Sequence, residues 1–471
     1  MSLGHDFGMI GLGTMGRNLV WNLADHGYSV AGLGRSQDRV NQLHRQSGEK
    51  PVHGYIDPKA FVHNLRRPRA IMLLVPAGPP VDDVINELLP LLDEGDLIID
   101  GGNSYFKDTE RRVKDLEAKH IGFFGMGVSG GASGARHGPS MMPGGTEALW
   151  ERVREMLEAV AAKAEEDGAP CVALVGPGGS GHYVKTVHNG IEYGIMQLIA
   201  EVYDTFKRGL GQSNAQIADT FEAWDAGVLR SFLAHITIEV LRRKDPDTGK
   251  DLVDLISDKA KQKGTGKWTS QDAMDLGVPL PTIDAAVAAR ELSGLKDERV
   301  KAEGLYKVEL PHLTTDFLPA DLMRDALFCA VILTYAQGFD QLGVASTEYG
   351  YNIKLDLVAR IWRAGCIIRS TFLQQIMDAY GRDAALPNLL LDSHVAGQVA
   401  QLQGALRNVV CAVQAAGIPA PALSASLAYL DGYRSSRLPA NLIQGQRDYF
   451  GSHTYERVDK PGVFHTDWES K

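Results

Sequence analysis

The chain has 471 residues, about three times the length of a typical domain, so two or three domains are expected. Its 58 acidic residues outnumber the 48 basic ones, and the formal charge of −10 excludes general attraction to nucleic acid or anionic membranes. The nearest approach to a membrane span, residues 408–430, is broken by Gln414, Pro419 and Pro421. The N-terminus lacks a signal peptide pattern, so we expect a cytoplasmic globular protein.

Cysteine and histidine spacing predicts no metal site. No cysteine pair and no His-Glu-x-x-His pattern occurs in the chain. The four cysteines are far apart in apolar runs, which indicates reduced core thiols rather than a disulfide framework: Cys171, Cys329, Cys366 and Cys411.

The first part of the chain alternates short apolar runs with helical stretches. This alternation is typical of strand–helix–strand units with a parallel sheet, so residues 1–177 are predicted to form a doubly wound, Rossmann-type domain. Buried strands are expected at residues 7–13, 28–33, 70–75, 96–100, 121–125 and 171–176.

Beyond Gly178 apolar residues recur three and four positions apart, which predicts an almost all-helical domain over residues 178–436. Residues 224–233 resemble residues 362–373, which indicates either a duplicated helical unit or a chance likeness between amphipathic helices. Residues 437–471 have little apolar periodicity and are expected to form an extended tail that lies on another surface. The fold class is therefore α/β followed by all-α.

A glycine-rich turn follows the first expected strand and precedes a helix. In this context the first glycine permits a tight turn, the second lets a pyrophosphate approach the backbone, and the third allows close helix–strand packing. We therefore expect a dinucleotide phosphate at Gly11, Leu12, Gly13, Thr14, Met15 and Gly16.

The end of the second expected strand predicts which dinucleotide is bound. A carboxylate there would bind the ribose 2′-hydroxyl of NAD, but the sequence has Gly34, Arg35 and Ser36. Because a guanidinium can make charge-assisted hydrogen bonds to a 2′-phosphate, we expect NADP.

A helix entered through residues 176–181 carries polar groups on one face. Lys185, His188, Asn189, Glu192 and Met196 have helical spacing, beside an apolar stripe that can bury the helix. In a pocket, burial would lower the lysine pKa and raise the carboxyl pKa, which suits a base and an acid. The pattern predicts oxidation of an alcohol next to a hydride acceptor.

Two other segments could bind anions. Residues 125–131 follow an expected strand at the edge of the sheet where ligands bind. Four lysines lie within nine residues that also include Gly264 and Gly266: Lys259, Lys261, Lys263 and Lys267. This cluster indicates either a phosphate site or merely a basic loop.

Over nearly its whole length the sequence resembles the long-chain 6-phosphogluconate dehydrogenase family. The motifs that carry the resemblance are at residues 11–16, 101–104, 128–131, 138–145, 181–197, 262–268 and 446–457. The resemblance implies NADP-dependent oxidative decarboxylation of 6-phospho-D-gluconate to D-ribulose 5-phosphate and carbon dioxide, in the pentose phosphate pathway. It also implies a homodimer in which each tail completes the partner's active site.

Matching motifs also imply roles for individual residues. Lys185 would be the general base and acid, and Glu192 the general acid. The cofactor would further contact Val75, Pro76, Ala77 and Asn103. The sugar acid would be held by Asn103, Ser129, Gly130, Gly131, His188 and Asn189. The phosphate would be held by Tyr193, Lys263, Thr265 and Arg290, together with Arg447 and His453 from the partner subunit's tail.

Two alternatives remain open at this stage. A β-hydroxyacid dehydrogenase of the 3-hydroxyisobutyrate type would share the glycine turn and the lysine helix but would be much shorter. A dinucleotide-sensing protein without catalysis would share the fold, although it would not need both Lys185 and Glu192. The sequence also departs from the resembling family, which usually has Asn at Gly34, Lys at Pro76 and Glu-Glu at residues 132–133.

Overall fold

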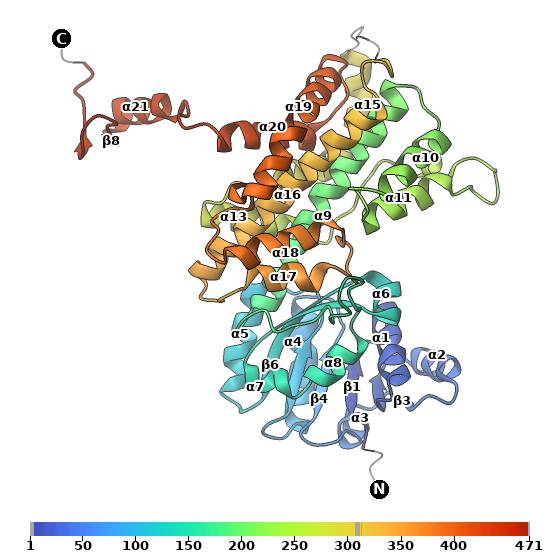
Figure 1. Cartoon of the computed structure of the whole chain (residues 1–471). Coiled ribbons are helices and arrows are strands. Elements are labelled where there is room, and N and C mark those ends of the chain that lie inside the picture. The colour runs from blue at the N-terminus through green and yellow to red at the C-terminus, as the bar shows by residue number, and fades with distance from the viewer. Residues whose placement is uncertain (1–3, 307–310, 312, 470–471) are drawn as a thin grey trace.

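The computed structural model describes residues 4–306, 311 and 313–469 and has a sheet-containing domain below a larger helical body (Figure 1). The N-terminal domain contains a seven-stranded sheet in the order β3-β2-β1-β4-β5-β6-β7. All neighbouring strands of this sheet are parallel except β6 and β7, so the predicted doubly wound fold is confirmed. The strands are β1 (Phe7–Ile10), β2 (Val30–Leu33), β3 (Val52–Tyr55), β4 (Ala70–Leu73), β5 (Leu97–Asp100), β6 (Gly122–Ser129) and β7 (Ser140–Gly144).

Helices cover both faces of this sheet. Met9 and Met72 pack in one buried cluster with residues of α1, α2 and α8, whereas Ile10 and Leu73 pack in another with residues of α3, α4 and α5. Burial on both faces explains why the strands read as continuous apolar runs. The helices are α1 (Thr14–Asp25), α2 (Gln37–Ser47), α3 (Pro58–His63), α4 (Pro79–Leu88), α5 (Phe106–Glu117), α6 (Gly131–His137), α7 (Glu147–Glu151) and α8 (Arg154–Val160), with a 3₁₀ turn at Leu89–Leu91.

The strand predicted at residues 171–176 was wrong, and the strands β3 and β7 were not predicted. Within residues 171–176 only Val172 forms a bridge, to Met141. The segment runs beside β7, but Pro143 has no N–H to donate, so the ladder is interrupted. The edge strand β3 is partly exposed and contains His53 and Gly54, and β7 contains a proline, so neither gives a clear strand pattern.

The second domain is helical, as predicted. Its two longest helices, α9 (Ser180–Asp204) and α16 (Ala320–Glu348), run through one continuous buried cluster. By length and composition α16 could span a membrane, but 83% of its most apolar window is buried, as in a core helix. The other helices are α10 (Asn214–Asp225), α11 (Phe232–Arg242), α12 (Leu252–Leu255), α13 (Thr265–Leu276), α14 (Pro281–Gly294), α15 (Lys296–Leu305), α17 (Leu355–Trp362), α18 (Phe372–Arg382), α19 (Ser393–Ala415) and α20 (Pro421–Tyr433), with a π turn at Thr205–Gly209 and a 3₁₀ turn at Leu389–Leu391.

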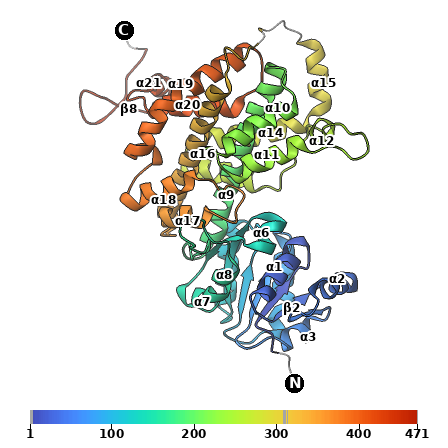
Figure 2. The ribbon, with the colours of Figure 1, turned by 45° about the vertical axis from the view of Figure 1, so that its right-hand side comes forward.

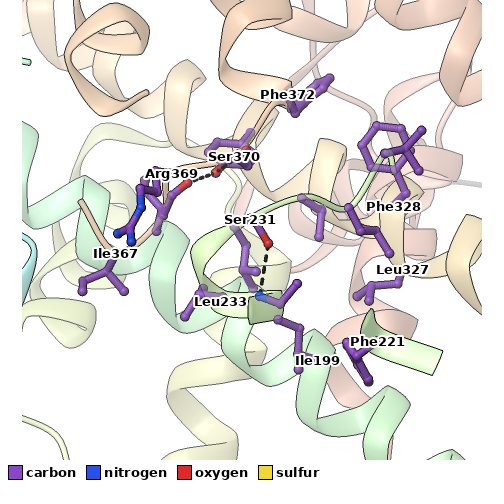
Figure 3. Close-up of a pocket in the computed structure, with 17 residues that line it drawn as sticks. Ile199, Phe221, Ser231, Leu233, Leu327, Phe328, Ile367, Arg369, Ser370 and Phe372 are labelled. Carbon is purple, nitrogen blue, oxygen red and sulfur yellow. Dashed lines mark hydrogen bonds between the residues drawn. The ribbon is translucent and has the colours of Figure 1, made fainter. Parts of the chain in front are cut away.

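The helical domain consists of two similar halves, which supports the predicted duplication. Each half has a long helix followed by two shorter ones, α9-α10-α11 and α16-α17-α18. The segments before α11 and α18 pair with each other, because Ser231 and Ser370 form an antiparallel bridge. A small apolar cavity of about 30 Å³ lies between the two halves near this bridge (Figure 3). Its volume is too small for a ligand.

Each long helix also caps a helix that follows the other long helix in the chain. On α9 the carboxylate of Glu201 accepts hydrogen bonds from the N–H groups of Ala422 and Leu423, both 2.8 Å, at the start of α20. On α16 the amide oxygen of Gln337 accepts from the N–H of Thr282, 3.0 Å, at the start of α14. These caps satisfy buried helix ends and fix the two halves to each other.

The tail was predicted to be extended, and that was wrong for its first part. It contains α21 (Ala440–Gly451) and a hairpin of β8 (Tyr455–Glu456) and β9 (Val463–Phe464), and it projects from the body (Figures 1 and 2). The buried Asp448 carboxylate accepts hydrogen bonds from the backbone of Thr454 and Thr466 and from the indole of Trp468. Local polar contacts rather than apolar periodicity therefore organise this segment.

The four cysteines are free thiols, and three of them are buried. Cys411 is exposed, which corrects its assignment to the core. It lies on α19, on a different side of the helix from Val409, Val410 and Val413, which are buried in the core. Among the described residues no group of three or more His, Cys, Asp or Glu is placed to hold a metal ion.

Candidate active site

Helix α9 begins directly against the sheet because glycines line the contact. A Cβ on Gly125 would clash with the His182 ring, and a Cβ on Gly127 would clash with the side chain of Lys185. Gly181 on the helix likewise faces the backbone of β6 and β7. The predicted catalytic face of α9 is therefore held at the carboxyl end of the sheet, where open α/β domains bind ligands.

The predicted catalytic face of α9 forms one connected cluster. The Nζ atom of Lys185 lies 3.1 Å from Nδ1 of His188, which in turn lies 3.8 Å from a carboxylate oxygen of Glu192. Asn189 Oδ1 is 3.3 Å from the same imidazole nitrogen. Lys185 and His188 are buried, whereas 22% of the Glu192 side chain is exposed. The imidazole thus lies between the lysine amine and the glutamate carboxylate.

Burial is the main cause of the shifted pKa values in this cluster. It lowers the pKa of Lys185, and the Glu192 carboxylate only partly offsets that effect. Burial raises the pKa of Glu192, against the opposing charges of Lys185 and Arg290. The pKa of His188 lies well below its usual value, first through burial and then through Lys185. The lysine is thereby suited to accept a proton and the glutamate to donate one.

The Ser-Gly-Gly turn after β6 meets a loop from the second half of the helical domain. The Ser129 hydroxyl lies 3.2 Å from Nε2 of His188 and accepts a hydrogen bond from the N–H of Ile367, 3.3 Å. A Cβ on Gly130 would clash with the carbonyl of Gly365, so only glycine fits there. The loop after α17 therefore closes the sugar-acid side of the site.

This loop was not foreseen as part of the site. In the sequence, residues 362–373 stood out only as half of the internal likeness, although Trp362 packs edge-on against His188 with ring centroids 5.3 Å apart. Cys366 also lies near enough to Lys185 for the charge of each group to affect the pKa of the other. A motif that repeats elsewhere gives no sign of which copy faces the site.

Two of the expected phosphate residues, Tyr193 and Arg290, meet beside Glu192, and helix α13 begins next to them. The guanidinium of Arg290 lies over the ring of Tyr193, 3.4 Å from its centroid. Gly266 packs against the same ring, where an added Cβ would be only 2.5 Å away. Thr265 is buried at the start of α13, and Lys263 is exposed just before it. A phosphate between these groups would meet a guanidinium, a hydroxyl and the N-terminus of α13.

The glycine turn before α1 fits a dinucleotide pyrophosphate. Gly11 has a positive φ of 101°, and a Cβ there would clash with the carbonyl of Leu74. Gly16 packs on the Gly11 carbonyl in the same way. Around Gly13 the space is open, because the nearest atom to an added Cβ is 3.8 Å away. No side chain caps the first turn of α1, so its N–H groups are left for a ligand.

The ribose end of this site is exposed and basic. Arg35 is exposed beside Ser36, which caps α2, and Arg39 reaches back to the Leu12 carbonyl, 3.3 Å. Arg39 was not foreseen, since its position inside α2 looked like an ordinary surface residue. An Asn side chain at Gly34 would need its neighbours to shift, because even a Cβ would be 3.1 Å from Val40.

The nicotinamide side of the expected cofactor site lies at the ends of β4 and β5. Val75, Pro76 and Ala77 follow β4, and Asn103 is exposed after β5. The loop before Asn103 is fixed by Asp100, which accepts from the Gly102 N–H at 3.0 Å. These residues therefore share the ligand-binding edge with Lys185.

Two expected residues are not brought to the site by this chain. Arg447 and His453 are exposed on the projecting tail, where Arg447 donates to the side chain of Gln444 at 3.0 Å. The ring of His453 packs edge-on against Phe450.

The doubly wound sheet, the glycine turn and the adjoining lysine–glutamate helix define a dinucleotide-dependent dehydrogenase fold. The family model for the NAD binding domain of 6-phosphogluconate dehydrogenase matches residues 6–176, and the model for that family's C-terminal domain matches residues 181–468. The chain belongs to the 6-phosphogluconate dehydrogenase family.

Relatives match along almost the whole chain. The NADP(+)-dependent, decarboxylating 6-phosphogluconate dehydrogenase of Bacillus subtilis is 51% identical over 98% of this chain and 99% of the relative. The decarboxylating enzyme of Lactococcus lactis is 50% identical, covering 98% of both chains. A solved structure of Plasmodium falciparum 6-phosphogluconate dehydrogenase has a TM-score of 0.94 at 42% identity, over 98% of this chain and 100% of that one.

Proposed function

We propose that this protein oxidises and decarboxylates 6-phospho-D-gluconate to D-ribulose 5-phosphate and carbon dioxide, with NADP as its cofactor. The observation that carries the proposal is the cluster on α9, where Lys185 and Glu192 flank His188 on one largely buried face. Relatives that match the chain from end to end have this activity in their names.

NADP, held by the glycine turn before α1 and by Arg35, supplies the hydride acceptor. Lys185, as a neutral amine, takes the proton of the 3-hydroxyl group while C3 is oxidised. The resulting ammonium then hydrogen-bonds to the new 3-keto oxygen as the carboxylate leaves as carbon dioxide. Glu192 finally protonates C1 of the enediol.

The neighbouring residues orient the substrate. His188, Asn189, Ser129, Asn103 and the amides of Gly130 and Gly131 bind the sugar acid. The phosphate is bound by Tyr193, Lys263, Thr265 and Arg290. His188 stays neutral, because burial and Lys185 lower its pKa, so it can accept from the ammonium of Lys185.

The proposal includes a cytoplasmic homodimer in which Arg447 and His453 reach the partner's phosphate site. The exposed positions of both residues and the projecting tail support it. Leu442 and Ile443 are 65% and 59% exposed on α21, which favours burial against another chain. Four free cysteines are typical of a reducing compartment.

One assay tests the activity. Purified protein is mixed with NADP and 6-phosphogluconate, and NADPH absorbance is followed together with released carbon dioxide. We expect both products in equal amounts. Without turnover the proposal fails, whereas NADPH without carbon dioxide would favour a β-hydroxyacid dehydrogenase.

A further inference from the structure

Helix α13, which begins at the proposed phosphate site, is joined to α9 by three successive contacts. Tyr183 on α9 donates a hydrogen bond of 2.6 Å to the carboxylate of Asp272 on α13. One turn further along α9, the Thr269 hydroxyl donates to the carbonyl of Thr186 at 2.8 Å. The third contact is the packing of Tyr193 on Gly266. Residue numbers rise on α9 as they fall on α13, so the helices run antiparallel.

The first contact is the most strongly fixed. Asp272 is buried, and its second oxygen accepts from the hydroxyl of Tyr349, at the end of α16, at 2.8 Å. Hydrogen bonds from hydroxyl groups to a carboxylate are short and about twice as strong as neutral ones. The carboxylate is thus held from α9 and from α16 at once.

Small residues let the two helices approach closely. A Cβ on Gly190 would lie 2.5 Å from Thr269, and a Cβ on Gly266 would lie 2.5 Å from the ring of Tyr193. The helices therefore cannot slide by a residue without a clash, and such packing has discrete rather than continuous alternatives.

We infer that the Tyr183–Asp272 contact is a positioning device that sets the length of phosphorylated sugar acid the site accepts. This inference rests on the proposed function. Lys185 and Tyr193 are eight residues apart on α9, or about 12 Å along its axis. The proposed phosphate-binding residues at the start of α13 lie beside Tyr193. The register between α9 and α13 therefore fixes the distance of these residues from Lys185.

Binding of phosphorylated aldonates with four, five and six carbons tests the inference in the full-length protein. Calorimetric titration should show that the wild type prefers the six-carbon acid. In Tyr183→Phe the preference for six over five carbons should fall by about tenfold, since one charge-assisted hydrogen bond is lost. Affinity for NADP should not change.

Tyr349→Phe is the matched control. It removes the other donor to the same carboxylate but leaves the direct link between α9 and α13 in place. Its melting temperature should fall about as far as that of Tyr183→Phe, with the chain-length preference kept. Equal changes of preference in both variants, or in neither, would overturn the inference and assign Asp272 a purely structural role.

Asp272→Asn provides a second test if Tyr183→Phe does not fold. The amide carries no charge, so its hydrogen bond with Tyr183 is no longer charge-assisted and is about half as strong, and the six-carbon preference should again narrow. An unchanged preference would overturn the inference. The proposed function fails separately, when the wild type binds 6-phosphogluconate but does not turn it over.

Discussion

The two ends of the proposed substrate site are built in opposite ways. At the α9 end, Lys185 and His188 are buried and in contact with each other within one chain. At the tail end, Arg447 and His453 are exposed. Arg447 donates a hydrogen bond to Gln444 and the ring of His453 packs against Phe450, so both contacts lie within the tail itself. The proposed proton-transfer groups therefore meet inside a single chain, whereas the proposed phosphate-binding residues of the tail face outward.

The two ends also differ in the interactions that set the pKa values of their buried groups. Desolvation by the surrounding domain governs the pKa values of Lys185 and Glu192. In the tail, hydrogen bonds from His465, Thr466 and Trp468 hold the pKa of the Asp448 carboxyl below its usual range despite its burial. Hydrogen bonds within the tail thus fix its local fold.

Removing the buried amine should have the largest effect. We expect Lys185→Ala to reduce kcat by about 10²–10⁴-fold, since the proposed general base is lost. Binding of NADP, measured by fluorescence titration, should survive because the glycine turn is untouched. Lys119→Ala, an exposed lysine ahead of β6, serves as the control. Nearly normal turnover in Lys185→Ala would show that another group is the base.

Removing the tail should act on substrate affinity. Deletion of the residues after Leu438 should raise KM for 6-phosphogluconate by at least about tenfold, because charge-assisted hydrogen bonds to phosphate are lost. Steady-state kinetics at saturating NADP provides the measurement. A truncated protein with normal KM would mean that the tail takes no part in the site.

Mixing variants sharpens the comparison between the two ends. Lys185→Ala chains carry an intact tail, and chains with Arg447→Ala and His453→Ala carry an intact α9. If tails are exchanged, a mixed dimer has one complete site, so subunit exchange should restore activity at low substrate concentration. Mixtures no more active than the sum of their parts would place each tail at its own chain's site.

The sequence predicted the α9 cluster well because its spacing is local. Lys185, His188 and Glu192 lie within eight residues, and a helix brings such positions onto one face without further information. The glycine turn was equally predictable, because its strand and helix adjoin it in the chain. The same reasoning gave the doubly wound sheet but missed β3 and β7, whose composition is not strand-like.

Contacts across long separations could not be predicted in this way. Ile367 donates a hydrogen bond to Ser129 although 238 residues separate them in the chain, and neither segment carries a sequence pattern that predicts the contact. Asp448 draws distant tail residues together with hydrogen bonds, a pattern with no periodicity to detect. Arg447 and His453 were predicted only from the resemblance to a known family, and the tail segment α21–β8 projects away from α9 within one chain (Figure 1).

The exposed ribose end offers a smaller test at the edge of the nucleotide domain. Arg35→Asp should shift the ratio of NADP to NAD affinity toward NAD by about ten- to a hundredfold, since a carboxylate repels a 2′-phosphate. Lys50→Asp, a more distant charge reversal in the same domain, controls for the change in net charge. An unchanged cofactor ratio would assign the 2′-phosphate to other residues, of which Arg39 is the nearest candidate.

The smallest predicted effect concerns the pH dependence that the two proposed proton-transfer groups give to the reaction. Lys185 must be neutral to act as a base, so kcat/KM falls as pH drops below its pKa; Glu192 must be protonated to act as an acid, so kcat/KM falls as pH rises above its pKa. Burial lowers the first pKa and raises the second. Gln cannot titrate, so the alkaline limb of the residual activity of Glu192→Gln should disappear. The acid limb should stay in place, because protonated Glu192 and Gln are both uncharged where Lys185 titrates. Glu291→Gln removes an exposed carboxylate, which solvent screens, and should leave both limbs in place. If the alkaline limb persists in Glu192→Gln, another group donates the proton to C1.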